Sequence, residues 1–301
     1  MDNSTEKKPL LKQGWLRVLL FIVFYCFITL LVSIPAILLL TPVKPGELES
    51  DAFQVIANLA SGFLWLLVLI ELLSCVVAVF VFRNFVDRNS ITSLGFSTTG
   101  HGHEMIAAFF LAPALIGIGS LILYFSKHLE WDYNGFNVQT LLMDAGTLAL
   151  IAFSEEIVFR AYILNNLMQS FNKWIALIAS SLLFTIFHLT NMGVSTIPLA
   201  SIFLSGILLG INYIYTKNVW FSIILHFSWN FFQGPLSGYK ISGASFSSLL
   251  QTDLKGDNAI TGGDYGFEGS FVATALLLIT VLLFYLIYER KFKVVVERAQ
   301  K

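Results

Sequence analysis

The chain has very little charge for its length. Only 12% of its 301 residues are charged and 56% are hydrophobic, whereas about a quarter of the residues of a soluble domain are charged. The mean hydropathy is +0.76. These values exclude an ordinary soluble domain and predict a polytopic membrane protein. A net charge of −1 without a basic aromatic surface also gives no reason to expect a nucleic-acid partner.

Cysteine is scarce as well. Cys26 and Cys75 are the two cysteines, and both fall in apolar segments, where a free thiol behaves as a small apolar group. They therefore say little about the redox compartment. A cleavable signal peptide is not expected, because the first apolar run is too long for one and no small-x-small cleavage site closes it.

Long apolar runs occupy most of the chain. A helix needs about 20 residues to cross a bilayer, and eight runs are candidates for an all-α membrane domain. We expect these spans near residues 15–41, 55–82, 104–126, 138–164, 174–191, 196–216, 218–234 and 269–288. A polar arm at 1–14 would precede this membrane domain of residues 15–289, and a basic tail at 290–301 would follow it.

The positive charges predict the orientation. With the N-terminus in the cytoplasm, thirteen lysines and arginines fall on inner segments and four on outer ones, with Arg160 set aside as intramembrane. The inner residues are Lys7, Lys8, Lys12, Arg17, Arg83, Arg88, Lys173, Lys217, Arg290, Lys291, Lys293, Arg298 and Lys301; the outer ones are Lys44, Lys127, Lys240 and Lys255. This bias favours eight spans with both termini in the cytoplasm, and the basic tail is expected to lie against the headgroups of the lipid bilayer.

Two adjacent acids and an arginine interrupt the fourth apolar run. Each such charge costs about 2.5–3.5 kcal/mol at the bilayer centre, so its presence there calls for a partner and a function. Glu156 and Arg160 are spaced i, i+4, as an ion pair on one helix face requires. Glu155 points about 100° away and is left available as a general base acting on water. The alternative is that all three form a buried network that fixes helix packing.

Two histidines lie in later apolar runs. His188 alone could be a proton carrier, a metal ligand or a hydrogen-bonding partner of a neighbouring helix. His226 and Asn230 are spaced i, i+4 and present two donors to one side, which suits an oxyanion hole or a metal site. Taken with the glutamates, spans four to seven are expected to build one polar cluster, the catalytic core.

Two further acids have open interpretations. Asp144 lies three helical turns before Glu155 and either lines an aqueous path or marks the outer end of its helix. Glu71 lies in the second span and could pair with a polar group of another helix, but no motif identifies that group.

The three motifs together resemble a known family. Glu-Glu-x-x-x-Arg at 155–160, Phe-x-x-x-His at 184–188 and His-x-x-x-Asn at 226–230 occur in the order and approximate spacing of the CAAX-protease and bacteriocin-processing intramembrane proteases. This family is also described as type II CAAX prenyl endopeptidase-like. The similarity covers about residues 145–235, and flanking features resemble bacterial members, which implies a bacterial cell membrane as the location.

The resemblance implies an intramembrane endopeptidase and a role for each motif residue. Glu155 would activate the attacking water with help from His188, and His226 with Asn230 would stabilise the oxyanion. Glu156 and Arg160 would hold the geometry. The substrate would be a peptide or a membrane-associated protein.

The cofactor stays open at this point. A divalent metal such as zinc bound by Glu155, His188 and His226 is one alternative, and a metal-free mechanism that uses the same residues is the other. The His-Glu-x-x-His helix of ordinary zinc peptidases is absent from the sequence.

Two functions of other classes also remain. The protein could be a membrane regulator or bacteriocin-immunity factor without proteolytic activity, in which the polar cluster serves helix association. It could also be a proton-coupled transporter with Glu155 and His188 as a relay, although the spans show no inverted repeat or paired broken helices.

Overall fold

The computed structural model describes residues 8–40, 64–135 and 137–299. Most of these residues are helical. The long helices are α1 (Gly14–Leu40), α3 (Leu64–Val81), α4 (Gly102–Phe125), α5 (Val138–Glu156), α7 (Lys173–Phe187), α8 (Thr196–Thr216), α9 (Trp220–Phe231) and α11 (Phe271–Ala299). The shorter helical elements are η2 (Phe82–Val86), η3 (Ile91–Leu94), η4 (Ile157–Leu164), α6 (Asn165–Leu167), η5 (Phe232–Leu236), α10 (Asn258–Thr261), η6 (Gly263–Tyr265) and η7 (Phe267–Gly269).

A helix lies at each of the eight expected ranges, but they are not equally suited to crossing a membrane. Among the described residues, five helices are long and apolar enough: α1, α3, α4, α8 and α11. Helix α7 is shorter, α9 has twelve residues, and α5 carries the two glutamates. Five candidate spans are therefore supported, and the count of eight stays a prediction. The expected start of the second span near residue 55, and Lys44 in the outer segment before it, lie outside the described residues.

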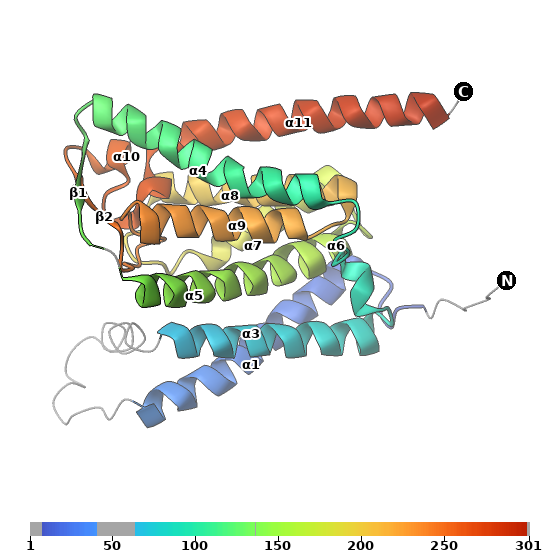
Figure 1. The fold of residues 1–301 in the computed structure, drawn as a ribbon. Helices are drawn as coiled ribbons and strands as arrows, with labels where there is room; N and C mark the ends of the chain where they lie inside the picture. Colours follow the sequence, from blue (N-terminus) through green and yellow to red (C-terminus); the bar gives the residue numbers. More distant parts are fainter. Residues whose placement is uncertain (1–7, 41–63, 136, 300–301) are drawn as a thin grey trace.

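The helices run back and forth along one direction (Figure 1). The start of α1 and the end of α11 lie at one end of the molecule, and the strands lie at the other. Helices α5, α8 and α9 lie centrally, with the α1–α3 pair on one side and α4 and α11 on the other. The expected basic tail does not form a separate element, because α11 continues as one helix to Ala299.

Outward-facing apolar side chains agree with a lipid environment. Large residues such as Val23, Leu38 and Phe125 are more than half exposed, and such an apolar surface is stable against lipid but not against water. Small residues face inward where helices meet. A Cβ on Gly206 of α8 would lie 2.9 Å from the Cβ of Ser181 on α7, so the glycine allows these two helices to approach closely.

A buried ion cluster joins the helices at the end where α1 begins. Both oxygens of the Asp87 carboxylate are paired, one with Arg17 at 3.0 Å and the other with Arg83 at 2.9 Å. The Tyr162 hydroxyl donates to the same carboxylate at 3.3 Å. Two of the cations counted for orientation are thus buried structural groups rather than free surface charges.

The segment between α9 and α11, residues 235–268, which the charge distribution predicts to lie outside and which we call the outer segment, is more structured than the sequence indicated. Its strand β2 (Leu250–Leu254) pairs antiparallel with β1 (Leu129–Tyr133), and Trp131 lies opposite Thr252. The expectation of an all-α chain is therefore right for the membrane helices and incomplete here. The sheet and the short helices fold this segment back onto the ends of the membrane helices (Figure 1).

Candidate active site

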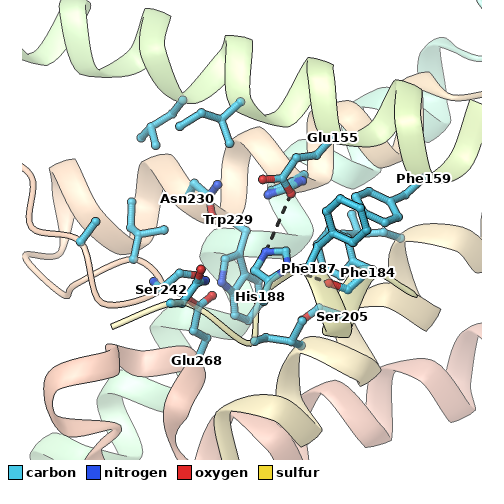
Figure 2. A pocket seen from close by; sticks show the side chains of 18 of the residues that line it. Glu155, Phe159, Phe184, Phe187, His188, Ser205, Trp229, Asn230, Ser242 and Glu268 are labelled. Carbon is cyan, nitrogen blue, oxygen red and sulfur yellow. Dashed lines mark hydrogen bonds and ion pairs between the residues drawn. The ribbon is translucent and has the colours of Figure 1, made fainter. Parts of the chain in front are cut away.

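The polar motifs of the sequence meet at a cavity of about 390 Å³ inside the helical bundle. Glu155 of α5, His188 at the end of α7, and His226 and Asn230 of α9 all line it. Figure 2 shows the carboxylate of Glu155 and the imidazole of His188 directed toward one another. The structure therefore brings together all four residues that the motifs predict to be catalytic.

His188 and His226 reach the cavity from different positions along their helices. Helix α7 ends at Phe187, and His188 is its C-cap with φ −94° and ψ 1°, so the ring sits where the chain leaves the helix. His226 lies in the second turn of α9, which begins at Trp220. Because α8 returns the chain between them, the two rings enter the cavity from helices that run in the same direction (Figure 1).

The Glu155–His188 pair is held open rather than closed. Nε2 of His188 lies 4.0 Å from Oε2 of Glu155, which is beyond hydrogen-bond length. Nδ1 of His188 lies 2.7 Å from the carbonyl oxygen of Phe184. A carbonyl can only accept, so Nδ1 carries the proton and Nε2 is free to accept one. Oε2 of Glu155 is buried without a hydrogen-bond partner among the described residues.

Glu156, Arg160 and His226 form a second, closely bonded group. Nη1 of Arg160 lies 2.8 Å from Oε1 of Glu156, so the ion pair predicted from the i, i+4 spacing is confirmed. Nδ1 of His226 donates to the same oxygen at 2.9 Å. This contact fixes one edge of the imidazole against α5 and leaves Nε2 on the other edge. No motif or spacing in the sequence predicted it.

Backbone and aromatic contacts complete the Arg160 environment. Nη2 of Arg160 donates to the carbonyl of Gly206 at 3.3 Å, and the guanidinium carbon lies 4.5 Å above the Phe184 ring. The Arg160 and Glu156 side chains are 1% and 0% exposed. A pair this deeply buried depends on each partner for neutralisation.

The chain departs from a regular α-helix directly after the two glutamates. Residues Ile157–Leu164 form a π-helical stretch, in which each turn takes more residues than in an α-helix. π-Helical turns are frequent at functional sites. The uniform 100° step assumed from sequence therefore applies to Glu155 and Glu156 but not to the residues that follow them.

Aromatic rings form much of the apolar wall of the cavity. Phe159, Phe184, Phe187 and Trp229 line it, and the Phe159 ring packs edge-to-face against Phe184 and Phe187. Asn230 is buried in the same lining, where it adds a polar carboxamide. The cavity thus combines an apolar lining with a few directed polar groups, as small-molecule and peptide sites do.

Several polar residues of the lining were not assigned to the site from the sequence, among them two carboxylates. Glu71 of α3 lines the cavity and accepts a hydrogen bond from the Tyr25 hydroxyl at 3.4 Å. Ser242 and Glu268 enter from the outer segment. An acid inside an apolar run was a usable signal for Glu71, whereas a loop offers no periodicity to place Ser242 or Glu268. Asp144 is not among the lining residues.

The acidic and histidine side chains of the cavity do not form a metal site. Within the described residues, no group of three or more His, Cys, Asp or Glu side chains could hold a metal ion. Tetrahedral zinc sets its nitrogen and oxygen ligands about 3.3 Å apart, and Glu155 and His188 are 4.0 Å apart. Glu155, His188 and His226 thus do not fit a metal in this arrangement.

The segment that carries all three motifs is similar to a known protein family. Residues 137–232 match the family model described as type II CAAX prenyl endopeptidase Rce1-like. The resemblance drawn from the motifs is confirmed. The match covers about a third of the chain and contains Glu155, His188, His226 and Asn230, whereas Glu71, Ser242 and Glu268 lie outside it. No curated protein matches the chain.

The Rce1-like match and the apolar helices agree with each other. The family is one of endopeptidases, so the match implies a protease. The five candidate spans fit a multi-pass membrane protein.

Proposed function

We propose that the protein is an intramembrane endopeptidase that uses Glu155 to activate a water molecule against a peptide bond. The observation that carries the proposal is the open Glu155–His188 pair in an otherwise apolar, aromatic cavity. Its substrate is a peptide or a membrane-associated protein segment. The protein resides in a cell membrane with both termini in the cytoplasm, as the distribution of lysine and arginine favours.

The 4.0 Å separation suits one water molecule. Two acceptors that each take one hydrogen of the same water, over bonds of about 2.8 Å, stand about 4.4 Å apart. Oε2 of Glu155 and Nε2 of His188 are both acceptors at close to this spacing. A water held in this way has its oxygen lone pair directed into the cavity, where a substrate carbonyl would lie.

The steps of the reaction follow from these positions. The water oxygen forms a bond to the carbonyl carbon as one of its protons passes to Glu155. The negative charge that develops on the carbonyl oxygen is stabilised by the Asn230 carboxamide and by Nε2 of His226 when that nitrogen is protonated. The proton on Glu155 then passes to Nε2 of His188, and from this nitrogen it passes to the leaving amine as the carbon–nitrogen bond breaks, so that Glu155 and His188 both return to their starting protonation states.

Glu156 and Arg160 act through His226. Glu156 holds the imidazole by Nδ1, and Arg160 holds Glu156. Neither needs to touch the substrate. The two carboxylates, although adjacent in sequence, thus have separate roles, because Glu156 is tied to two cationic or donor groups and Glu155 lies open to the cavity.

The test compares peptides released by cells that express the wild-type chain, Glu155→Gln or His188→Ala, followed by cleavage assays with purified protein. General acid–base groups contribute about 10²- to 10⁴-fold, so each variant should lose at least about 100-fold in rate while retaining its thermal unfolding temperature. Glu130→Gln is the control, because Glu130 is 62% exposed in β1. Full activity of Glu155→Gln would refute the proposal, and a native phenotype maintained by Glu155→Gln would favour the non-proteolytic regulator.

A further inference from the structure

The outer segment contributes a carboxylate to the wall of the cavity. Glu268 belongs to η7, immediately before α11, and lies in the cavity lining with Ile241, Ser242 and Ala244 of the same segment. All four lie beyond the residues matched by the family model. This side of the cavity is therefore built by a part of the chain that the family model does not cover.

The Glu268 carboxylate is held by one oxygen only. The backbone N–H and the hydroxyl of Ser242 donate to Oε1 of Glu268 at 2.6 and 2.8 Å. Both of the hydrogen bonds that this carboxylate accepts from described residues go to Oε1, which leaves Oε2 for another donor. A carboxylate fixed at one oxygen and open at the other is preorganised to bind a further donor.

The backbone around Ser242 makes this placement rigid. Ser242 has φ +48° and Gly243 has φ +85°, and the Gly243 N–H donates to the Tyr265 carbonyl at 2.9 Å. A Cβ on Gly243 would lie 2.2 Å from the carbonyl oxygen of Met192. The turn that holds Glu268 thus packs tightly against the loop that follows His188.

The charges of the cavity lining are unbalanced. Three carboxylates line it, those of Glu71, Glu155 and Glu268, and no lysine or arginine is among the described lining residues. The two imidazoles of the lining are the groups able to offset this charge. Burial raises the pKa of Glu268, while its hydrogen bonds from Ser242 and the charges of the two histidines oppose this rise. A cation placed beside Glu268 would offset part of the cost of burying its charge.

Glu268 and Glu155 approach His188 from different sides. In Figure 2 the His188 imidazole lies between the Glu155 carboxylate and the Glu268 side chain. A peptide whose carbonyl lay at the Glu155–His188 pair would extend toward Glu268 with a neighbouring side chain. The Trp229 ring of the lining offers an apolar surface for the stem of such a side chain.

We propose that Glu268 determines substrate specificity by binding the ammonium or guanidinium group of a lysine or arginine side chain close to the cleaved bond. That the ligand is a side chain of a peptide substrate rests on the proposed function. Ser242 is a positioning residue in this arrangement, because it touches Glu268 and orients its open oxygen.

The experiment measures binding rather than cleavage, so that it succeeds or fails independently of catalysis. The Glu155→Gln protein in detergent is titrated with N-acetylated hexapeptide amides of leucine, alanine and phenylalanine, in which a single lysine occupies each position in turn. Matched peptides carry norleucine, which has a stem of similar length without the charge. One further peptide has norleucine and a free amino terminus.

The expected result is at least about tenfold tighter binding of one or more lysine peptides over their norleucine partners, as a charge-assisted hydrogen bond supplies. This preference should fall below about threefold when Glu268→Gln is added, because glutamine keeps an oxygen for Ser242 but carries no charge. Asp253→Asn removes an acid of the same outer segment that is 63% exposed and should leave the preference unchanged.

Each other result overturns the inference. Equal binding of lysine and norleucine peptides, or no measurable binding of either, shows that Glu268 selects no basic side chain. A lysine preference that persists in the Glu268→Gln variant would show that another acid binds the lysine. Preference for the free amino terminus alone means that the site reads the end of the chain. In all of these cases the proposed function stands or falls separately, on the activity of Glu155→Gln and His188→Ala.

Discussion

His226 and Arg160 bind the same oxygen. Nδ1 of His226 lies 2.9 Å and Nη1 of Arg160 lies 2.8 Å from Oε1 of Glu156, so one carboxylate joins α9 to the helix that carries both glutamates. The orientation of His226 and the neutralisation of a buried guanidinium therefore depend on a single side chain. Stability and activity are coupled at this point.

Replacing Arg160 by alanine should destabilise the protein strongly. The change leaves Glu156, which is 0% exposed, as a buried charge without its cation, and breaking a buried pair costs about 3–5 kcal/mol. The midpoint of thermal unfolding in detergent should fall by several degrees or more, and activity should fall with it. Tryptophan fluorescence during heating measures the midpoint.

A matched arginine supplies the control for this variant. Arg290 lies on the exposed surface of α11, and Arg290→Ala should change stability by less than about 0.5 kcal/mol. If Arg160→Ala unfolds at the wild-type temperature, Arg160 does not clamp Glu156. The carboxylate would then need another source of neutralisation.

The contact between the outer segment and the loop after His188 should be sensitive to a single methyl group. Gly243→Ala places a Cβ 2.2 Å from the Met192 carbonyl oxygen at a φ of +85°, so the two loops must separate. The left-handed backbone alone costs about 1–2 kcal/mol in a residue with a Cβ. We expect an added protease to cut the variant faster within residues 235–268, and the variant to cleave its peptide substrate more slowly. Its helical circular dichroism spectrum should be nearly unchanged.

Gly100→Ala separates backbone strain from collision. Gly100 has φ +82°, close to that of Gly243, but no described atom lies within 4 Å of the point that a Cβ on Gly100 would occupy. It should therefore show the strain without the loosened loop. If the added protease cuts residues 235–268 equally fast in Gly243→Ala and Gly100→Ala, the contact between Gly243 and Met192 does not hold the outer segment in place.

How much of the site is visible in the sequence depends on how far apart its partners lie. The Glu156–Arg160 pair follows from i, i+4 spacing on one helix, and it is present as expected. The His226–Glu156 hydrogen bond joins residues 70 positions apart, and no local period encodes which two helices meet. The sequence supplied the participants of that contact but not their pairing.

The depths of the two histidines in the bundle and the structure of the outer segment could also not be predicted from local sequence patterns. From Trp174, a continuous helix would carry His188 about 21 Å along its axis, and from Val219 it would carry His226 only about 11 Å. Helix α7 is continuous to Phe187, and both histidines line one cavity, so α7 and α9 must begin at different depths in the bundle. Ser242 and Glu268 lie in a segment whose fold depends on strand pairing with β1, more than a hundred residues earlier.

The requirement for a metal ion separates the two mechanisms that the motifs allow. Nδ1 of His188 donates to the Phe184 carbonyl and Nδ1 of His226 to Glu156, so only Nε2 of each ring could bind a metal. The spacing of 4.0 Å between Nε2 of His188 and Oε2 of Glu155 is wider than tetrahedral zinc sets, and no group of three or more such side chains among the described residues could hold a metal ion. We therefore expect the purified protein to contain far less than one zinc per chain and to keep its cleavage rate in the presence of o-phenanthroline or EDTA. Elemental mass spectrometry and the peptide assay measure the two quantities, with a zinc peptidase in the same detergent as the positive control. Loss of activity with chelator, restored by stoichiometric zinc, would instead show that Glu155, His188 and His226 move together around a metal.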